Sequence, residues 1–262
     1  MTSLVDETIA ELRANHDRLR AVVEGLTDAQ LAAQSGAEKW TVADVLSHLG
    51  SGAEIARYSL LTALGDDGTG DERPTNQDVW DRWNALPPTE QASGFLESDA
   101  RLVELYESLT PEQRETTMVD LGFLPAPVPL TTPLAMRLNE QTLHGWDARA
   151  GLDPAAVLSD DAADLVVRHY TGSMAFMLGF TGKADKLDED VRLTVGDHTL
   201  VVDDSVALVE GVEAPTATFT GPREAFVRLM AGRLKPPANT PAGIEVTGNV
   251  TLEELRRVFP GY

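Results

Sequence analysis

The sequence predicts an α+β protein in which a helical bundle is followed by a smaller unit of mixed helix and sheet. Apolar side chains recur at helical spacing through about the first 180 residues. After about Asp188, short runs rich in β-branched residues alternate with turn residues instead. A chain of 262 residues, 42% of them hydrophobic, can form one large domain or two modest ones. We therefore expect a helical bundle over residues 1–182 and an α+β domain over residues 183–262.

The first helices are marked by their capping residues. Leu4–Val23 carries apolar side chains at near-helical spacing and predicts the first long helix. Thr27 with Gln30 is typical of a capping box that opens a short helix, and Thr41 with Asp44 repeats the pattern before a long apolar stripe. The helix after Thr41 is the most strongly specified one in the chain.

Further helices are predicted by periodicity over the ranges Thr75–Ala85, Thr89–Leu109, Thr132–Ala150 and Ser159–Gly179. The stretch between Val119 and Pro133 is apolar but rich in proline, so it cannot be an interior helix or a central strand. We expect it to form a structured loop over the core.

The carboxyl-terminal region predicts a small sheet with two helices. Strands are expected at Val191–Val195, Thr199–Val202, Val206–Val209, Thr216–Thr220 and Ile244–Thr247. The first two should form a hairpin through Gly196, Asp197 and His198. Helices are expected at Pro222–Met230, with proline in the first turn, and at Leu252–Val258.

Composition limits the classes of partner. The formal net charge of -21 makes the surface repel nucleic-acid phosphates and anionic lipids, so neither partner is expected. No cysteine is present, so a nucleophilic thiol would have to come from another molecule. The sequence has no signal-peptide pattern and no run of about 20 apolar residues, which predicts a cytoplasmic protein. We expect a monomer or a homodimer.

Three residues have the chemistry of a metal site. Glu140 and His144 are four residues apart on one predicted helix, so both side chains project from the same face. A carboxylate and a neutral imidazole suit zinc or another borderline divalent ion, and such a pair needs a third ligand from a neighbouring element. His48, deep in the helix after Thr41, is the natural candidate.

The spacing alone leaves other interpretations open. His48 could be a core histidine with a backbone or carboxylate partner, and Glu140 with His144 could be a solvated surface pair. His16 lies on a polar face and His198 in a predicted turn, so both are expected to be solvated.

Several charged residues are candidates for supporting roles. Asp44 precedes His48 by four residues and Asp147 follows His144 by three, so each could orient an imidazole. Capping by Asp44 and surface exposure of Asp147 are equally compatible with the sequence. Arg82 and Arg228 are candidates for binding a substrate carboxylate, because a planar guanidinium pairs with it.

Two segments together resemble a known family. Trp40-Thr41-Val42-Ala43-Asp44-Val45-Leu46-Ser47-His48-Leu49 and Asn139-Glu140-Gln141-Thr142-Leu143-His144-Gly145-Trp146-Asp147 are similar to motifs of the mycothiol-dependent maleylpyruvate isomerase family, whose members are DinB-like four-helix bundles. The resemblance implies a divalent ion, expected to be zinc, on His48, Glu140 and His144. The carboxyl-terminal region resembles the smaller sterol-carrier-like domain of these proteins.

The resemblance also implies the chemistry. Three protein ligands leave an open position on a tetrahedral ion, where mycothiol as co-substrate would become a thiolate. Attack of that thiolate on a small electrophile could lead to cis/trans isomerisation or to thiol transfer. A metal-dependent hydrolase that activates water and a non-catalytic carrier of small molecules or lipid are the alternatives. The residues that would bind the thiol are not identified by the sequence.

Overall fold

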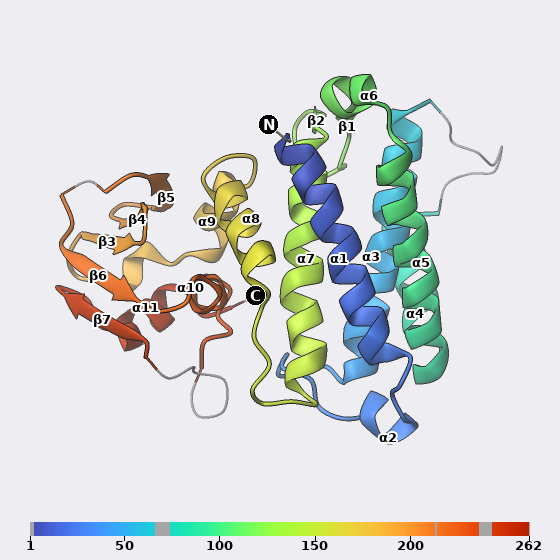
Figure 1. Ribbon diagram of the computed structural model, residues 1–262, viewed down its shortest axis with the longest axis horizontal. Helices are drawn as coiled ribbons and strands as arrows, with labels where there is room; N and C mark the ends of the chain where they lie inside the picture. Colours follow the sequence, from blue (N-terminus) through green and yellow to red (C-terminus); the bar gives the residue numbers. More distant parts are fainter. Residues whose placement is uncertain (1–2, 66–73, 213, 236–242, 262) are drawn as a thin grey trace. The chain divides into compact units, whose positions relative to one another are not determined.

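The computed structural model of the chain describes residues 3–65, 74–212, 214–235 and 243–261. The chain divides into two compact units, Met1–Asp153 and Pro154–Tyr262. The first is helical apart from one short ribbon, and the second combines helices with a sheet (Figure 1). The predicted α+β class, with the helical part first, is confirmed. Among the described residues, every helix is too short or too polar to cross a bilayer.

The first unit is a bundle of four long helices. They are α1 (Leu4–Val23), α3 (Val42–Ala63), α5 (Pro88–Ser108) and α7 (Thr131–Ala150). Both α3 and α1 pack against α5 and α7, and Figure 1 shows the four helices side by side. The apolar stripes meet in the middle, where Leu12, Leu49 and Phe95 are fully buried. The capping box predicted before α3 is present, since Thr41 Oγ1 accepts from the backbone N–H of Asp44 at 3.1 Å.

Short elements connect the four helices. The helices among them are α2 (Asp28–Leu31), α4 (Asn76–Asn84) and α6 (Pro111–Thr116). The proline-rich stretch forms an antiparallel ribbon of two very short strands, β1 (Met118–Val119) and β2 (Val128–Pro129). The chain then enters α7 with Pro133 in its first turn, where the missing N–H costs no helical hydrogen bond.

The second unit contains a five-stranded sheet and its covering helices. Its strands are β3 (Val191–Val195), β4 (His198–Val202), β5 (Val206–Glu210), β6 (Ala217–Thr220) and β7 (Glu245–Gly248). The strand order is β5-β4-β3-β6-β7, and every neighbouring pair is antiparallel except β3 with β6. The predicted hairpin is present, and Gly196 supplies the positive φ of +61° that its turn requires. The helices are α8 (Asp160–Tyr170), α9 (Ala175–Thr181), the 3₁₀ turn η1 (Ala184–Lys186), α10 (Arg223–Met230) and α11 (Leu252–Val258).

The single helix predicted from Ser159 to Gly179 is wrong, because α8 ends at Tyr170 and α9 begins at Ala175. Glycine and serine in the intervening segment favour a turn over a helix interior. That turn is held by the backbone N–H of Met174, which donates to the carbonyl of His169 at 2.8 Å.

The division between the units also differs from the boundary expected after residue 182. Helix α8 packs against α10, and α9 packs against β5, so both belong to the second unit. Helical periodicity shows that a segment is amphipathic, but it does not show which core the apolar face covers.

Candidate metal centre

Two neighbouring helices of the bundle bring the three candidate ligands together. His48 lies in the second turn of α3, and Glu140 and His144 lie on one face of α7. Each offers one ligand atom, and the three atoms lie within 4.8 Å of one another. His48 Nε2 is 2.8 Å from Glu140 Oε2, and His144 Nε2 is 3.5 Å from the same oxygen. Glu140 and His144 are therefore not a solvated surface pair.

The imidazole of His144 is oriented by a buried carboxylate. Its Nδ1 lies 2.9 Å from Oδ2 of Asp147, whose side chain is almost fully buried. With the carboxylate as acceptor, Nδ1 donates, so Nε2 is the nitrogen that faces Glu140. Asp44 does not share this role: its carboxylate accepts from the backbone N–H of Thr41 at 2.9 Å and caps α3.

Trp40 closes one side of the cluster. Its ring centroid lies 5.0 Å from that of His48 and 5.5 Å from that of His144. The loop that carries Trp40 is fixed, because the backbone N–H of Ser35 donates to the Trp40 carbonyl at 3.0 Å and that of Gly36 donates to the Asp147 carbonyl at 2.7 Å. The indole therefore restricts how the two imidazoles can move.

The other side of the cluster opens on a cavity of about 180 Å³ inside the bundle. His48 and Glu140 contribute to its wall, together with a largely apolar lining that includes Ile55, Leu60, Val119, Leu130 and Met136. The side chains of His48 and Glu140 are 35% and 33% exposed, whereas that of His144 is 9% exposed. A small molecule in the cavity would thus reach two of the three side chains directly.

Glu140 is held as a carboxylate. Burial raises its pKa, but the hydrogen bond with His48 and the nearby charges of His144, His48 and Arg137 lower it further, to about 2. Two imidazole nitrogens and one ionised carboxylate oxygen form the kind of donor set that catalytic zinc sites use. The residues present therefore fit a divalent ion.

A second polar cluster, which we call the Asp99 cluster, lies deeper in the bundle and was not predicted. Asp99 on α5 accepts hydrogen bonds from Arg137 Nη2 at 2.6 Å and from Gln141 Nε2 at 2.6 and 2.8 Å. His16 Nδ1 of α1 lies 2.8 Å from its other side, so the expectation that His16 is solvated is wrong. Burial raises the pKa of Asp99, but Arg137 and His16 together hold it below its usual value.

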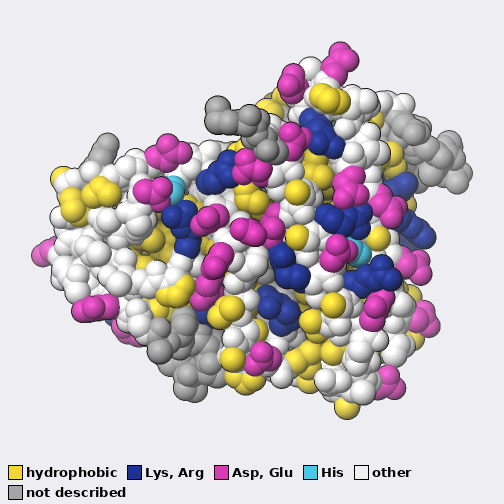
Figure 2. Space-filling model, in the orientation of Figure 1, with side chains coloured by type: hydrophobic (Ala, Val, Ile, Leu, Met, Phe, Trp, Pro, Cys, Tyr) yellow, Lys and Arg dark blue, Asp and Glu magenta, His cyan; other side chains and the backbone are white. Residues whose placement is uncertain are grey.

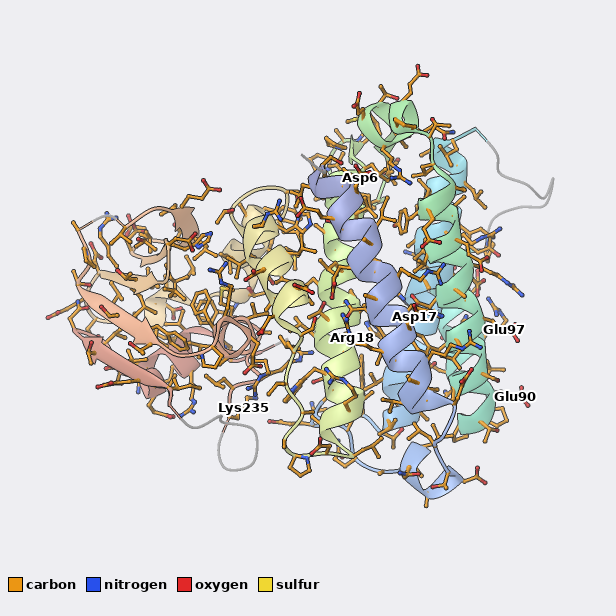
Figure 3. All side chains as sticks on the ribbon, viewed as in Figure 1. Asp6, Asp17, Arg18, Glu90, Glu97 and Lys235 are labelled. Carbon is orange, nitrogen blue, oxygen red and sulfur yellow. The ribbon has the colours of Figure 1, made fainter. Side chains whose placement is uncertain are left out.

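The sequence contained one signal for this cluster. Arg137 and Gln141 are four residues apart on α7, within a stretch whose other side chains are almost all buried. Charged residues are buried only when they are paired, so a buried Arg required an acidic partner from another helix. On the outer face of the same α5 helix, Glu90 and Glu97 instead project away from the bundle (Figure 3).

Each of the two arginines that were candidates for binding a substrate carboxylate is paired with a glutamate. Arg82 pairs with Glu54 on the bundle surface, and Arg228 pairs with Glu224 at 2.8 Å in the interior of the second unit. Arg82 does not line the cavity beside the candidate ligands. His198 is not solvated as expected, because it begins β4 and is buried, with Nδ1 2.8 Å from Asp197.

The surface agrees with the acidic composition. Acidic and basic side chains are interspersed over the face shown in Figure 2, and no broad basic patch is visible there.

Comparison with known proteins adds a family and a fold. The model of a family described as the mycothiol maleylpyruvate isomerase N-terminal domain matches residues 12–149, which is more than half of the chain and includes all three candidate ligands. No curated protein sequence matches the chain significantly.

Two solved structures share the fold. They are crystal structures of a mycothiol-dependent maleylpyruvate isomerase and of a histidine-to-alanine mutant of it. Each is 18% identical to this chain, and the matches cover 100% of both chains with TM-scores of 0.64 and 0.65.

Proposed function

Because the chain belongs to the mycothiol maleylpyruvate isomerase family and is an enzyme of that kind, we propose that His48, Glu140 and His144 hold a divalent ion, zinc, and that mycothiol is the nucleophile. The substrate would be a small electrophilic acid. The observation that carries the proposal is the convergence of three ligand atoms within 4.8 Å at the wall of an apolar cavity.

The metal supplies one function. A divalent ion on these three side chains is a Lewis acid that favours thiolate over thiol at neutral pH, while three protein ligands leave room for a further one. The remaining contributions come from the chain itself.

The protein's own groups position and shield the reaction. Asp147 keeps the Nε2 lone pair of His144 directed inward, and the low pKa of Glu140 keeps its carboxylate ionised. Trp40 on one side and the apolar cavity wall on the other limit access of water. A preorganised, largely apolar cavity favours attack by the thiolate over hydrolysis.

The proposed reaction is addition of the thiolate to an activated double bond. A carbon–sulfur bond forms, the former double bond becomes single and rotates, and elimination of the thiolate restores the double bond in the trans form. If a leaving group departs instead of the thiolate, the outcome is thiol transfer. The same cluster supports both outcomes, and the substrate decides between them.

The test is to incubate zinc-loaded protein with mycothiol and maleylpyruvate, together with a panel of other electrophiles, and to follow isomerised acid and thiol adducts by mass spectrometry. We expect turnover that requires both the ion and the thiol. Turnover that needs the ion but no thiol would indicate activation of water and contradict the proposal. Turnover unchanged after chelation would exclude the metal.

A further inference from the structure

Arg137 belongs to the Asp99 cluster and also lines the cavity beside the candidate ligands. Its side chain is only 4% exposed. Its Nη2 donates to Asp99 Oδ1 at 2.6 Å and to the backbone carbonyl of Leu49 at 3.0 Å. The guanidinium is therefore fixed between α5 and α3 through a single nitrogen.

The other two nitrogens of this guanidinium make no hydrogen bond to any residue that the structure describes. Within the part of the chain that the structure describes, Nε is buried without a hydrogen-bond partner, and the hydrogen bonds of Arg137 all come from Nη2. Nη1 lies on the side of Gly52, another residue of the cavity wall, where an added Cβ would be 3.4 Å away. A guanidinium has five donors, and leaving buried donors unpaired costs free energy.

The cavity wall also contains a neutral hydrogen-bond donor, the hydroxyl of Tyr106. Tyr106 lines the same cavity, is buried, and makes no hydrogen bond through its hydroxyl to any residue in the described ranges. Burial raises the pKa of this hydroxyl well above its usual value, so the group stays protonated. A buried tyrosine hydroxyl usually has a partner.

We propose that Arg137, assisted by Tyr106, binds a carboxylate of the acid substrate in this cavity. The inference rests on the proposed function and names the residues that would hold its acid substrate, an acid with a carboxylate on the chain that bears its electrophilic double bond. Maleyl and pyruvyl groups both carry a carboxylate, so a maleylpyruvate-like acid fits this class.

The position of Arg137 connects the carboxylate to the reaction. Arg137 precedes Glu140 by three residues on the same helix face, and Leu49, which its guanidinium contacts, follows His48 directly. An acid held at Nη1 would therefore lie in the cavity whose wall also contains His48 and Glu140. The cavity would select acids over esters, because an ester offers the cation no negative charge.

A purely structural role is the alternative for Arg137, and two variants separate it from substrate binding. Arg137→Lys keeps the positive charge beside Asp99 but removes the donors on the cavity side. Gly52→Ala leaves the Asp99 pair intact and places a methyl group against Nη1, and alanine favours the helix. The matched control is Gly179→Ala, the same change in a helix of the second unit with open space around it.

The experiment titrates maleate, and separately its dimethyl ester, into the zinc-loaded protein without thiol by calorimetry. Metal content, kcat and KM for maleylpyruvate with mycothiol are measured in the same preparations. In Gly52→Ala and Arg137→Lys we expect maleate affinity to fall, and KM for the acid to rise, about tenfold or more. Metal content and KM for mycothiol should stay at wild-type values, as should every parameter of Gly179→Ala.

Wild-type maleate affinity in both cavity variants, or equal affinity for maleate and its ester, would overturn the inference. Failure of the proposed function gives a different result. Maleate binding that depends on Arg137 in a protein without thiol-dependent turnover would support the carboxylate site and contradict the thiol chemistry.

Discussion

The bundle contains two clusters that each pair a histidine with a carboxylate, and they differ in access. In the candidate metal centre, His48 lies 2.8 Å from a glutamate and both side chains are about one third exposed. In the Asp99 cluster, His16 lies 2.8 Å from an aspartate and both are almost completely buried. The histidine–carboxylate distance is the same, so distance does not distinguish a reactive site from a structural one. Access to a cavity does.

The second difference is how completely the hydrogen-bonding groups of each cluster are paired within the protein. The Asp99 carboxylate accepts from three side chains on two other helices, which leaves it little capacity for a ligand. In the candidate metal centre, two imidazoles converge on one carboxylate oxygen and the open side faces the cavity. We therefore expect substitutions of Asp99 to change stability and substitutions in the candidate metal centre to change metal binding and activity.

The largest expected effect is loss of the metal. His48→Ala or His144→Ala should lose the stoichiometric ion and lower turnover by more than about 100-fold, because each removes a ligand. The helical circular dichroism should remain, since the site is half-open and not part of the apolar core. Metal content is measured by elemental analysis, with His198→Ala in the second unit as the control that keeps the ion. Full metal occupancy in both ligand variants would exclude the ligand assignment.

The next effect is on stability. Asp99→Asn leaves the buried Arg137 guanidinium without a charged partner, which should lower the free energy of unfolding by about 3–5 kcal/mol. Urea unfolding measures this difference. The control is Glu97→Gln on the exposed face of the same helix, expected within about 0.5 kcal/mol of wild type. A loss below about 1 kcal/mol in Asp99→Asn would show that the pair contributes little.

The elements that the sequence predicted well are those with local signals. Thr41 and Asp44 are three residues apart, and their capping box determines where α3 begins whatever packs against it. The same holds for Glu140 and His144, whose shared face follows from helical geometry. His48 could be named as a candidate third ligand, but its spacing left a core histidine equally open, because the pairing of α3 with α7 is a tertiary contact; the family resemblance then favoured the ligand role.

The errors arose where a polar pattern was taken to mean solvent. The polar face around His16 contains a residue that points inward, because Asp99 on α5, itself paired with Arg137 of α7, is the partner of His16 there. The sequence of α1 alone gives no signal of these contacts with other helices. In the same way, the helical periodicity from Ser159 onward did not show which core the segment covers, because α8 and α9 pack against α10 and β5, which lie far along the chain.

A smaller effect should distinguish the two aspartates that the sequence offered as orienting groups. Asp147→Asn weakens the acceptor that fixes the imidazole of His144, so metal affinity should fall about 10–100-fold. Asp44→Asn is the matched control: Asp44 also lies near a ligand in sequence, but it caps α3, so metal affinity should be unchanged. Competition with a chromophoric chelator measures both. Equal affinities in the two variants would show that Asp147 does not orient the ligand.

The smallest effect is the pH dependence that the Asp99 cluster gives to stability. The pKa of Asp99 in the folded protein lies below the unfolded value of about 3.8, because Arg137 and His16 outweigh its burial. The unfolded chain therefore binds the proton first as pH falls. The stabilisation is complete above the unfolded pKa and is lost as pH falls through the folded one.

Wild-type protein and Asp99→Asn should thus differ most in unfolding free energy near pH 6, and the gap should narrow below about pH 4. Urea unfolding of both proteins at several pH values measures the gap, and Glu97→Gln serves as the control for general acid effects. A gap that stays constant down to pH 3 would mean that the aspartate titrates at the same pH in both states. The Asp99 cluster would then differ from the candidate metal centre in access alone, without the charge pairing that we infer stabilises it.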